Sequence, residues 1–290
     1  MNLETRGEKI FKVFNYILLS LISLITLYPV VYVISASLSS PAAVLAGRVA
    51  IWPVELTLDS YKILLKDADI YRAYANTIFY TGVGTLISIT LEVLMAYPLS
   101  KKRLFGRSGI SMGLAFSMWI SAGMIPLYLV IKSLGLLNSR MGLLIPFACS
   151  AYHIILLRTF FQSLPEAFEE YAKIEGAGDW RILTSIYIPL SKAAIATVIL
   201  YIAVGKWNSY FWAMTILRDD SKMPLQVLLK NMVVQMSVST SGDSAGGATN
   251  LSQETMVYST MVIAMVPMLI LYPFIQKYFV KGVMVGGVKG

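Results

Sequence analysis

Long apolar runs separated by short polar segments dominate the chain. Six runs are long enough to cross a membrane as helices, and they cover approximately residues 13–38, 75–99, 110–131, 141–161, 193–217 and 255–278. A helix crosses a hydrocarbon core of about 30 Å with roughly 20 apolar residues, because its backbone N–H and C=O groups bond to one another. The pattern predicts an all-α polytopic membrane protein with about six transmembrane helices.

Prolines fall inside several of these runs, at Pro29, Pro126, Pro146, Pro267 and Pro273. Neighbouring membrane helices satisfy the backbone groups that proline frees, so we expect each run to remain a span. The first run follows three basic residues, as in a signal peptide. It is too long for the apolar region of about 7 to 15 residues that such peptides carry, and we expect it to stay in the protein.

Composition agrees with a membrane protein. Of the 290 residues, 57% are apolar and 14% are charged, whereas soluble domains average about 45–50% and about 25%. The net charge of +8 is divided among loops between apolar runs, which argues against a nucleic-acid-binding face. One cysteine, Cys149, excludes a disulfide scaffold within the chain.

The positions of Lys and Arg predict the orientation of the chain. The cluster Lys101-Lys102-Arg103 directly follows the second run, and basic residues in short loops near the ends of spans stay inside. The predicted topology is N-in and C-in. It places residues 163–190 inside, and residues 39–74 and 218–254 outside.

The inside segment 163–190 is predicted to form a helix–turn–helix. Ser163 and Glu166 have the spacing of a capping box, so a first helix should begin there and end at Gly176. Its apolar face should oppose its charged face. The apolar side chains are Phe168, Tyr171, Ala172 and Ile174, and the charged ones are Glu166, Glu169, Glu170 and Lys173.

A second short helix should follow in the same segment. Asp179 is a candidate N-cap for a helix from Trp180 to about Ile188, which Pro189 should stop. On the residues alone, such a hairpin either packs beneath its own bundle or docks a partner.

The hairpin resembles the EAA loop of ABC importer permeases, in which Glu-Ala-Ala is followed by Asp-Gly-Ala and then Ile-x-Leu-Pro at fixed spacing. The matching residues are Glu170, Ala172, Gly176, Ala177, Ile186, Pro189 and Leu190. Tyr171, Glu175 and Ile188 depart from the pattern. The pair Asn76-Thr77 and the ending 281–290 extend the resemblance to the carbohydrate-uptake branch, including the smaller permease of the maltose importer and related oligosaccharide permeases.

The resemblance implies a type I ABC importer permease fold in a multi-pass protein of the bacterial cytoplasmic membrane. It implies a heterodimer with a second, homologous permease subunit, two ATPase subunits, an extracytoplasmic solute-binding protein and a carbohydrate substrate. The chain has no Walker motif, so the resemblance implies a non-catalytic subunit without cofactors, whose ATPase partners bind ATP and Mg. The coupling residues would be Glu170, Ala172, Glu175, Gly176, Ala177, Ile186 and Pro189.

Ionisable residues within the runs are candidates for the substrate path, because charge in a membrane is costly. They are Glu92, His153 and Lys206. Lys206 begins a run in which aromatic rings could stack on sugars and polar groups could bond hydroxyls; its other candidates are Trp207, Asn208, Tyr210, Phe211 and Trp212. Helical spacing pairs Asn208 with Trp212, and Trp207 with Tyr210 and Phe211. An aromatic belt at the outer interface is the alternative, and for His153 an interhelical hydrogen bond is favoured.

The outer segment 218–254 contains small polar residues from 237 to 247, a composition typical of a flexible projection. Composition alone favours a passive connector. In the maltose relative the corresponding loop enters the sugar cleft of the docked binding protein. The resemblance thus implies binding-protein contacts at Ser239, Gly242, Asp243, Gly246 and Gly247.

Two other classes of protein stay open. A secondary transporter acting without ATPase subunits is expected to carry ion-coupling charges on discontinuous helices, often in repeated halves, and the sequence shows no such repeat. A membrane-embedded enzyme would need a catalytic cluster, for which one His and one Glu on different runs give little support.

Overall fold

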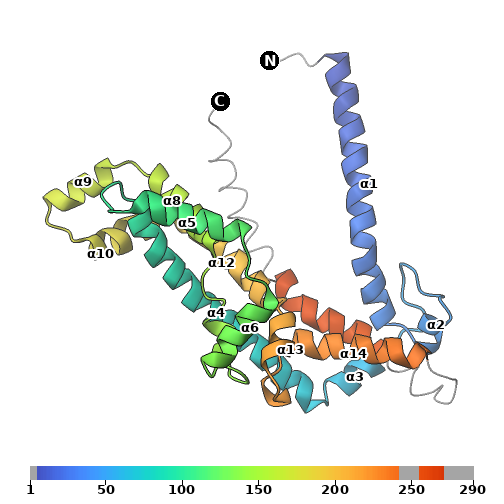
Figure 1. Ribbon diagram of the computed structural model, residues 1–290. Coiled ribbons are helices and arrows are strands. Elements are labelled where there is room, and N and C mark those ends of the chain that lie inside the picture. The colour runs from blue at the N-terminus through green and yellow to red at the C-terminus, as the bar shows by residue number, and fades with distance from the viewer. Residues whose placement is uncertain (1–4, 242–254, 271–290) are drawn as a thin grey trace. The chain divides into compact units, whose positions relative to one another are not determined.

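The computed structural model describes residues 5–241 and 255–270, and all the regular structure in these ranges is helical (Figure 1). The chain divides into two compact units. Among the described residues, the first unit contains 5–68, 229–241 and 255–266, and the second contains 69–228 and 267–270. Each unit is described by itself below.

The first unit is organised around the C-terminal end of α1, Arg6–Ser37. A capping box between Thr5 and Glu8 begins this helix, which continues through Pro29. The short helices α2 (Pro41–Leu45) and α3 (Asp59–Leu64) follow. The helix Thr255–Ile270 joins them, because Ser60 Oγ donates a hydrogen bond to Thr255 Oγ1 at 2.8 Å.

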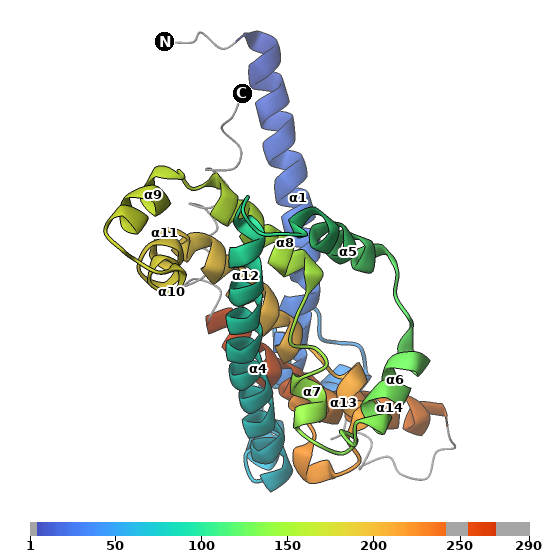
Figure 2. The ribbon, with the colours of Figure 1, turned by 60° about the vertical axis from the view of Figure 1, so that its left-hand side comes forward.

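The second unit is built on α4, Ala68–Ser100. The helices α5 (Arg107–Trp119) and α12 (Lys192–Trp207) both contact α8 (Ala151–Ser163). Buried side chains of α4, α8 and α12 form one apolar core with the segment 182–187, among them Leu157, Phe161 and Val198. Figure 2 shows these helices together with the short hairpin of α9 and α10 at one end of the unit.

Helix length and apolar composition single out α1 and α4 as potential membrane spans among the described residues. Two bent pairs qualify only when each is taken as one span. These are α5 with α6 (Met124–Ser133), bent by 116°, and residues 179–190 with α12, bent by 83°. By length and composition, the described residues thus contain two potential spans, or up to four if each bent pair is one span. The described part of the last predicted run forms the shorter helix Thr255–Ile270.

The predicted runs 110–131, 141–161 and 193–217 are each interrupted rather than single continuous helices. The first run breaks at residues 120–123, where Gly123 has φ +84°, a conformation that side chains with a Cβ disfavour. The second contains only α7 (Met141–Leu144) before Pro146 interrupts it ahead of α8. In the third, α12 ends at Trp207 and α13 occupies Phe211–Ile216.

The described part of the segment 218–254, which ends at Ser241, is more ordered than its composition predicts. A 3-10 turn at Asp220–Lys222 precedes α14, Leu225–Ser241, so the predicted flexible stretch is helical from residue 237 to Ser241. Ser239 therefore belongs to a helix. The other expected binding-protein contacts, Gly242, Asp243, Gly246 and Gly247, lie outside the described residues.

Candidate functional site: an exposed helical hairpin and a polar cavity

The segment 163–190 does form two helices joined by a turn. The first is α9, Ala167–Ile174. The predicted capping box is wrong, because Ser163 ends α8 and its Oγ donates to Phe160 O at 2.8 Å. Pro165 disfavours helical backbone at Leu164, which is extended, so the chain leaves α8 before α9 begins. Glu166 instead pairs with Lys102 at 2.6 Å.

Gly176 ends α9, as its position predicted. Its φ is +78°, its N–H donates to Lys173 O at 2.9 Å, and the N–H of Ala177 donates to Ala172 O at 2.9 Å. These two bonds define a Schellman motif, which satisfies the last carbonyls of the helix and turns the chain sharply.

The second helix differs from its prediction at both ends. Gly178 is the N-cap of α10 (Asp179–Ile182), and Asp179, the first helical residue, forms an ion pair with Arg103. Pro189 does not stop the helix. A π turn at Leu183–Tyr187 keeps the chain helical into α11, Ile188–Leu190, because the N–H of Ile188 bonds to Leu183 O five residues earlier.

A buried ion pair fixes α9 to the end of α4. Lys101, 7% exposed, pairs with Glu169, and its Nζ lies 3.6 Å from the ring centroid of Tyr187 and 4.4 Å from that of Tyr97. Burial opposes ionisation of Glu169, but its bonds to Lys101 and Lys173 outweigh that effect and lower its pKa to about 2. Glu169 therefore faces its own bundle, while Glu170, from the same predicted charged face, is exposed.

Large apolar side chains are exposed on the hairpin. Tyr171 is 71% exposed, Ile174 81% and Trp180 67%. Of the predicted apolar face of α9, Ala172 alone packs against the core, where Ala177 and Ile186 join it. Glu170, Glu175, Gly176 and Pro189 are exposed.

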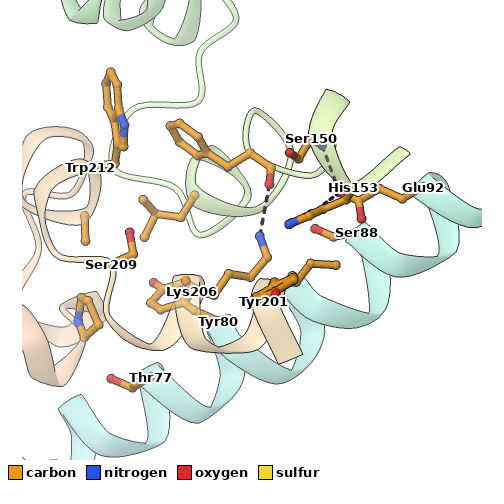
Figure 3. A pocket seen from close by; sticks show the side chains of 16 residues that line it. Thr77, Tyr80, Ser88, Glu92, Ser150, His153, Tyr201, Lys206, Ser209 and Trp212 are labelled. Carbon is orange, nitrogen blue, oxygen red and sulfur yellow. Dashed lines mark hydrogen bonds and ion pairs between the residues drawn. The ribbon is translucent and has the colours of Figure 1, made fainter. Parts of the chain in front are cut away.

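A cavity of about 250 Å³ lies between α4, the segment from α7 to α8, α12 and α13 (Figure 3). Three ionisable candidates, Glu92, His153 and Lys206, line it together with Trp212. They come from α4, α8, α12 and α13, so residues from three runs of the sequence meet at one site.

Glu92 is the buried centre of one wall. Its Oε1 accepts hydrogen bonds from the backbone N–H of Ser150 at 3.0 Å and lies 3.1 Å from His153 Nδ1. The interhelical hydrogen bond expected for His153 is therefore present. The His153 ring also stacks on Tyr201 with a centroid separation of 6.3 Å.

Lys206 extends along the opposite side of the cavity. Its Nζ donates to Phe147 O at 3.3 Å. Its aliphatic stem packs against Gly84 of α4, where an added Cβ would lie 2.7 Å from Lys206 Cδ. Gly84 thus leaves the space that the lysine stem occupies.

The rest of the predicted aromatic run does not line this cavity. Trp207 is buried edge-on against Tyr74, and Asn208 Nδ2 donates to Val204 O at 3.0 Å. Tyr210 and Phe211 are exposed. The expected helical pairings fail because residues 208–210 form a break between α12 and α13.

Several lining residues were missed from the sequence, namely Thr77, Tyr80, Ser88, Ser150, Tyr201 and Ser209. The signal for part of this set was present: Thr77, Tyr80, Ser88 and Glu92 share one face of α4 by helical spacing. Their placement next to α12 depends on the tertiary fold.

Asn76 and Thr77, the pair that carried part of the resemblance, tie α4 to a distant loop. Asn76 Nδ2 donates to Ser221 O at 2.8 Å and to Met223 O at 3.1 Å. Thr77 Oγ1 accepts from the N–H of Leu225 at 2.8 Å. These bonds hold residues 221–225 against α4 within the second unit, beside the cavity.

Comparison with known proteins agrees with this architecture. Residues 1–285 match the family described as "Binding-protein-dependent transport system inner membrane component". The chain belongs to this family. It is therefore a membrane permease component, as the resemblance of its EAA loop implied.

Relatives in the family cover nearly the whole chain. The polygalacturonan/rhamnogalacturonan transport system permease protein YtcP of Bacillus subtilis (strain 168) is 39% identical over 98% of this chain and 99% of its own. Protein LplC of the same organism is 38% identical over 99% and 97%. A chain in the crystal structure of a bacterial ABC transporter involved in the import of the acidic polysaccharide alginate is 44% identical, with a TM-score of 0.88, covering 96% of this chain and 100% of its own.

Proposed function

We propose that this chain is the permease subunit of an ABC importer that takes up an oligosaccharide delivered by a solute-binding protein. The names of its relatives support this proposal, since they include permeases for polygalacturonan/rhamnogalacturonan, diacetylchitobiose and arabinooligosaccharides. A second permease subunit and two ATPase subunits would complete the transporter. ATP and Mg would bind to the ATPase subunits.

The observation that carries the coupling role is the construction of α9. Its inner side is fixed to the bundle through Glu169 and Lys101, while Tyr171 and Ile174 stand exposed on its outer side. Exposed aromatic side chains are typical anchors of protein interfaces. A short helix held rigidly on one side and docked on the other would transmit displacement of an ATPase subunit to the bundle.

Glu170 and Gly176 would then contribute to docking. Glu170 is exposed and could accept hydrogen bonds from a basic group of the ATPase subunit. A Cβ at Gly176 would meet no atom of the chain within 4 Å, so the ATPase surface could approach this turn closely.

The same network supports the orientation of the proposed six-span, N-in and C-in topology. Lys101, Lys102 and Arg103, whose position indicates the inner side, form ion pairs with Glu169, Glu166 and Asp179 of the hairpin. The basic cluster and the coupling hairpin therefore belong to one side of the membrane, which in this proposal is the cytoplasmic side.

The cavity is the proposed substrate path within this subunit. It combines rings that can stack on a sugar, such as Trp212 and Tyr201, with polar groups from Glu92, His153 and Lys206. Tyr210 and Phe211, exposed outside the cavity, fit the alternative of an aromatic belt.

Purification from the native membrane tests the proposal. ATPase subunits should co-purify with the chain, and the loaded binding protein should stimulate their ATP hydrolysis. Tyr171→Ser should reduce retention of the ATPase subunits, whereas Trp52→Ser, at another highly exposed aromatic residue, should not. Transport by the chain alone would contradict the proposal and support a secondary transporter.

A further inference from the structure

We propose that the cavity is a subsite for an acidic sugar unit, in which Lys206 binds the carboxylate of a uronate residue. This inference rests on the proposed function and adds the charge of the substrate and the residue that recognises it. It depends on which polar groups of the cavity already have partners.

Two buried acceptors in the cavity wall are unsatisfied. Glu92 Oε2 and Ser88 Oγ have no hydrogen-bond partner among the described residues, although the two residues are 1% and 2% exposed. Buried polar atoms in native proteins nearly always have a partner. These two lie one helical turn apart on α4 and line the cavity, so a ligand that brings hydroxyl donors would satisfy them.

Lys206 is the complementary group. An ammonium has three N–H donors, and the hydrogen bond shown for Nζ goes to a neutral carbonyl, Phe147 O. Within the described residues no carboxylate lies at ion-pair distance from Nζ, and Glu92 Oε1 is engaged by Ser150 and His153. The lysine therefore retains the capacity to bind an anion.

The stem of Lys206 is held in place. Gly84 provides the groove in which Cδ and Cε lie, and Leu144 packs on the same spot. A cation whose stem is already packed loses less rotamer freedom on binding than a free lysine does. The site is thus organised before the ligand arrives.

The dimensions of the cavity agree with a single sugar ring. Its volume of about 250 Å³ is slightly below the range in which drug-sized ligands are held. A hexuronate ring offers hydroxyl donors for the α4 side, a carboxylate for Lys206 and apolar faces for Trp212. Figure 3 shows Lys206 directed across the cavity, with Glu92 and Ser88 on the helix beside it.

The substrates named for two relatives have the required chemistry. Polygalacturonan is a polymer of a uronic acid, and alginate is described as an acidic polysaccharide. Both relatives are more similar to this chain than the permeases named for diacetylchitobiose and arabinooligosaccharides, at 39% and 44% identity against 27% and 25%.

The rival explanation is that Lys206 only balances the charge of Glu92. In that case its removal would disturb the cavity equally for acidic and neutral sugars. The two explanations therefore differ in how binding depends on the charge of the ligand.

The test uses the purified permease–ATPase complex without its binding protein. Equilibrium binding is measured for labelled trisaccharides of galacturonate and of alginate, and for the same trisaccharides with each carboxylate reduced to a neutral alcohol. The wild-type complex should bind at least one acidic form about tenfold more tightly than its neutral counterpart, as expected for one charge-assisted hydrogen bond.

Three variants locate the effect. Lys206→Met should abolish the preference, because it weakens binding of the acidic form more than that of the neutral form, and Lys206→Arg should retain most of it. Lys132→Met is the matched control, since Lys132 also lies in the last turn of a helix but outside the cavity, and it should behave as the wild type. Thermal unfolding in detergent confirms that each variant is folded.

Several results would overturn the inference. These are equal binding of acidic and neutral forms by the wild type, no measurable binding of either acidic form, or a Lys206→Met variant that keeps the preference or weakens both forms equally. Each leaves the proposed function standing if ATPase subunits co-purify. Failure of the ATPase subunits to co-purify would instead contradict the proposed function.

Discussion

A single residue of α4, Gly84, makes room for the stem of Lys206, which lines the polar cavity. Gly82 and Gly84 lie on the same helix two residues apart, yet a Cβ at Gly82 would meet nothing within 4 Å, whereas one at Gly84 would lie 2.7 Å from Lys206 Cδ and 3.1 Å from Leu144 Cδ2. The atom in the way belongs to a long side chain, which can move without displacing a helix. The absence of a side chain at Gly84 therefore makes room for the Lys206 side chain and not for the backbone of another helix.

This contrast gives a residue-scale prediction. Gly84→Ala should displace the Lys206 stem and reduce uptake of the substrate several-fold, while the protein remains folded because alanine favours a helix by about 1 kcal/mol over glycine. Gly82→Ala is the control and should transport normally. Uptake into reconstituted vesicles and thermal unfolding are the two measurements. Equal uptake by the two variants would show that the lysine stem has other space available.

At the scale of elements, the attachment of α9 to α4 combines one buried and one exposed ion pair. Lys101 and Glu169 have side chains 8% and 13% exposed, whereas Lys102 and Glu166 are 78% and 68% exposed. Breaking a buried pair destabilises by about 3–5 kcal/mol, and an exposed pair contributes about 0–1 kcal/mol. Neighbouring lysines thus have very different importance.

The prediction compares these two lysines. Lys101→Met should loosen α9 and reduce the coupling of ATP hydrolysis to transport, because Glu169 loses its buried partner and the two tyrosine rings lose their cation. Lys102→Met should change neither the attachment of α9 nor the coupling of ATP hydrolysis to transport. Hydrogen exchange of residues 167–174 measures the loosening, and the ratio of ATP hydrolysed to substrate transported measures the coupling. Faster hydrogen exchange in both variants would contradict the conclusion that the buried pair, and not the exposed pair, holds α9.

Glu169 also predicts how the attachment depends on pH. Its folded-state pKa of about 2 is below the ordinary value of 4.5, so its ionised form stabilises the fold above pH 4.5. That contribution is lost as the pH falls from about 4.5 towards 2. Exchange protection of α9 should therefore be constant between pH 5 and 8 after correction for intrinsic rates. Glu169→Gln should lack the loss of thermal stability that the wild type shows below pH 4.5.

The turn after α9 provides another prediction at this scale. Gly176 has a positive φ, so Gly176→Asp introduces conformational strain of about 1 kcal/mol, but its side chain would meet open space within the chain. The variant should therefore insert in the membrane, and loss of transport should follow from interference with the docked ATPase subunit. Gly178→Asp is the control, since its φ of −73° adds no such strain. Normal transport by the Gly176 variant would argue against docking here.

At the scale of the whole molecule, the orientation in the membrane can be tested with thiol reagents. Cys149 is the only cysteine in the sequence, so a Cys149→Ser background allows single cysteines to be introduced. In intact spheroplasts a membrane-impermeant reagent should label Asp220→Cys and not Lys102→Cys. Permeabilised cells should label both. The opposite pattern would invert the proposed topology and place the hairpin on the wrong side for an ATPase.

The sequence by itself determined the class of the protein and the place of the helical hairpin, residues 163–190, that we propose to be cytoplasmic. Transfer of apolar side chains out of water depends on composition, so the membrane class follows from the runs alone. The turn at Gly176 is equally local, because it needs only a residue that tolerates positive φ. The spacing from Glu170 to Leu190 was specific enough to indicate the family to which the chain belongs.

Only the tertiary structure decided which residues of the hairpin and of the spans meet. Glu169 and Glu170 are adjacent and chemically identical in the sequence, and the packing of α9 on α4 makes one a buried ion-pair partner and leaves the other exposed. Lys206, Glu92 and His153 are far apart along the chain, and the break at residues 208–210 directs Trp212 into their cavity while Trp207 packs elsewhere. Helical periodicity cannot predict such a break, because it assumes a continuous helix. Contacts between helices cannot be predicted from one run either, because they depend on side chains from several runs.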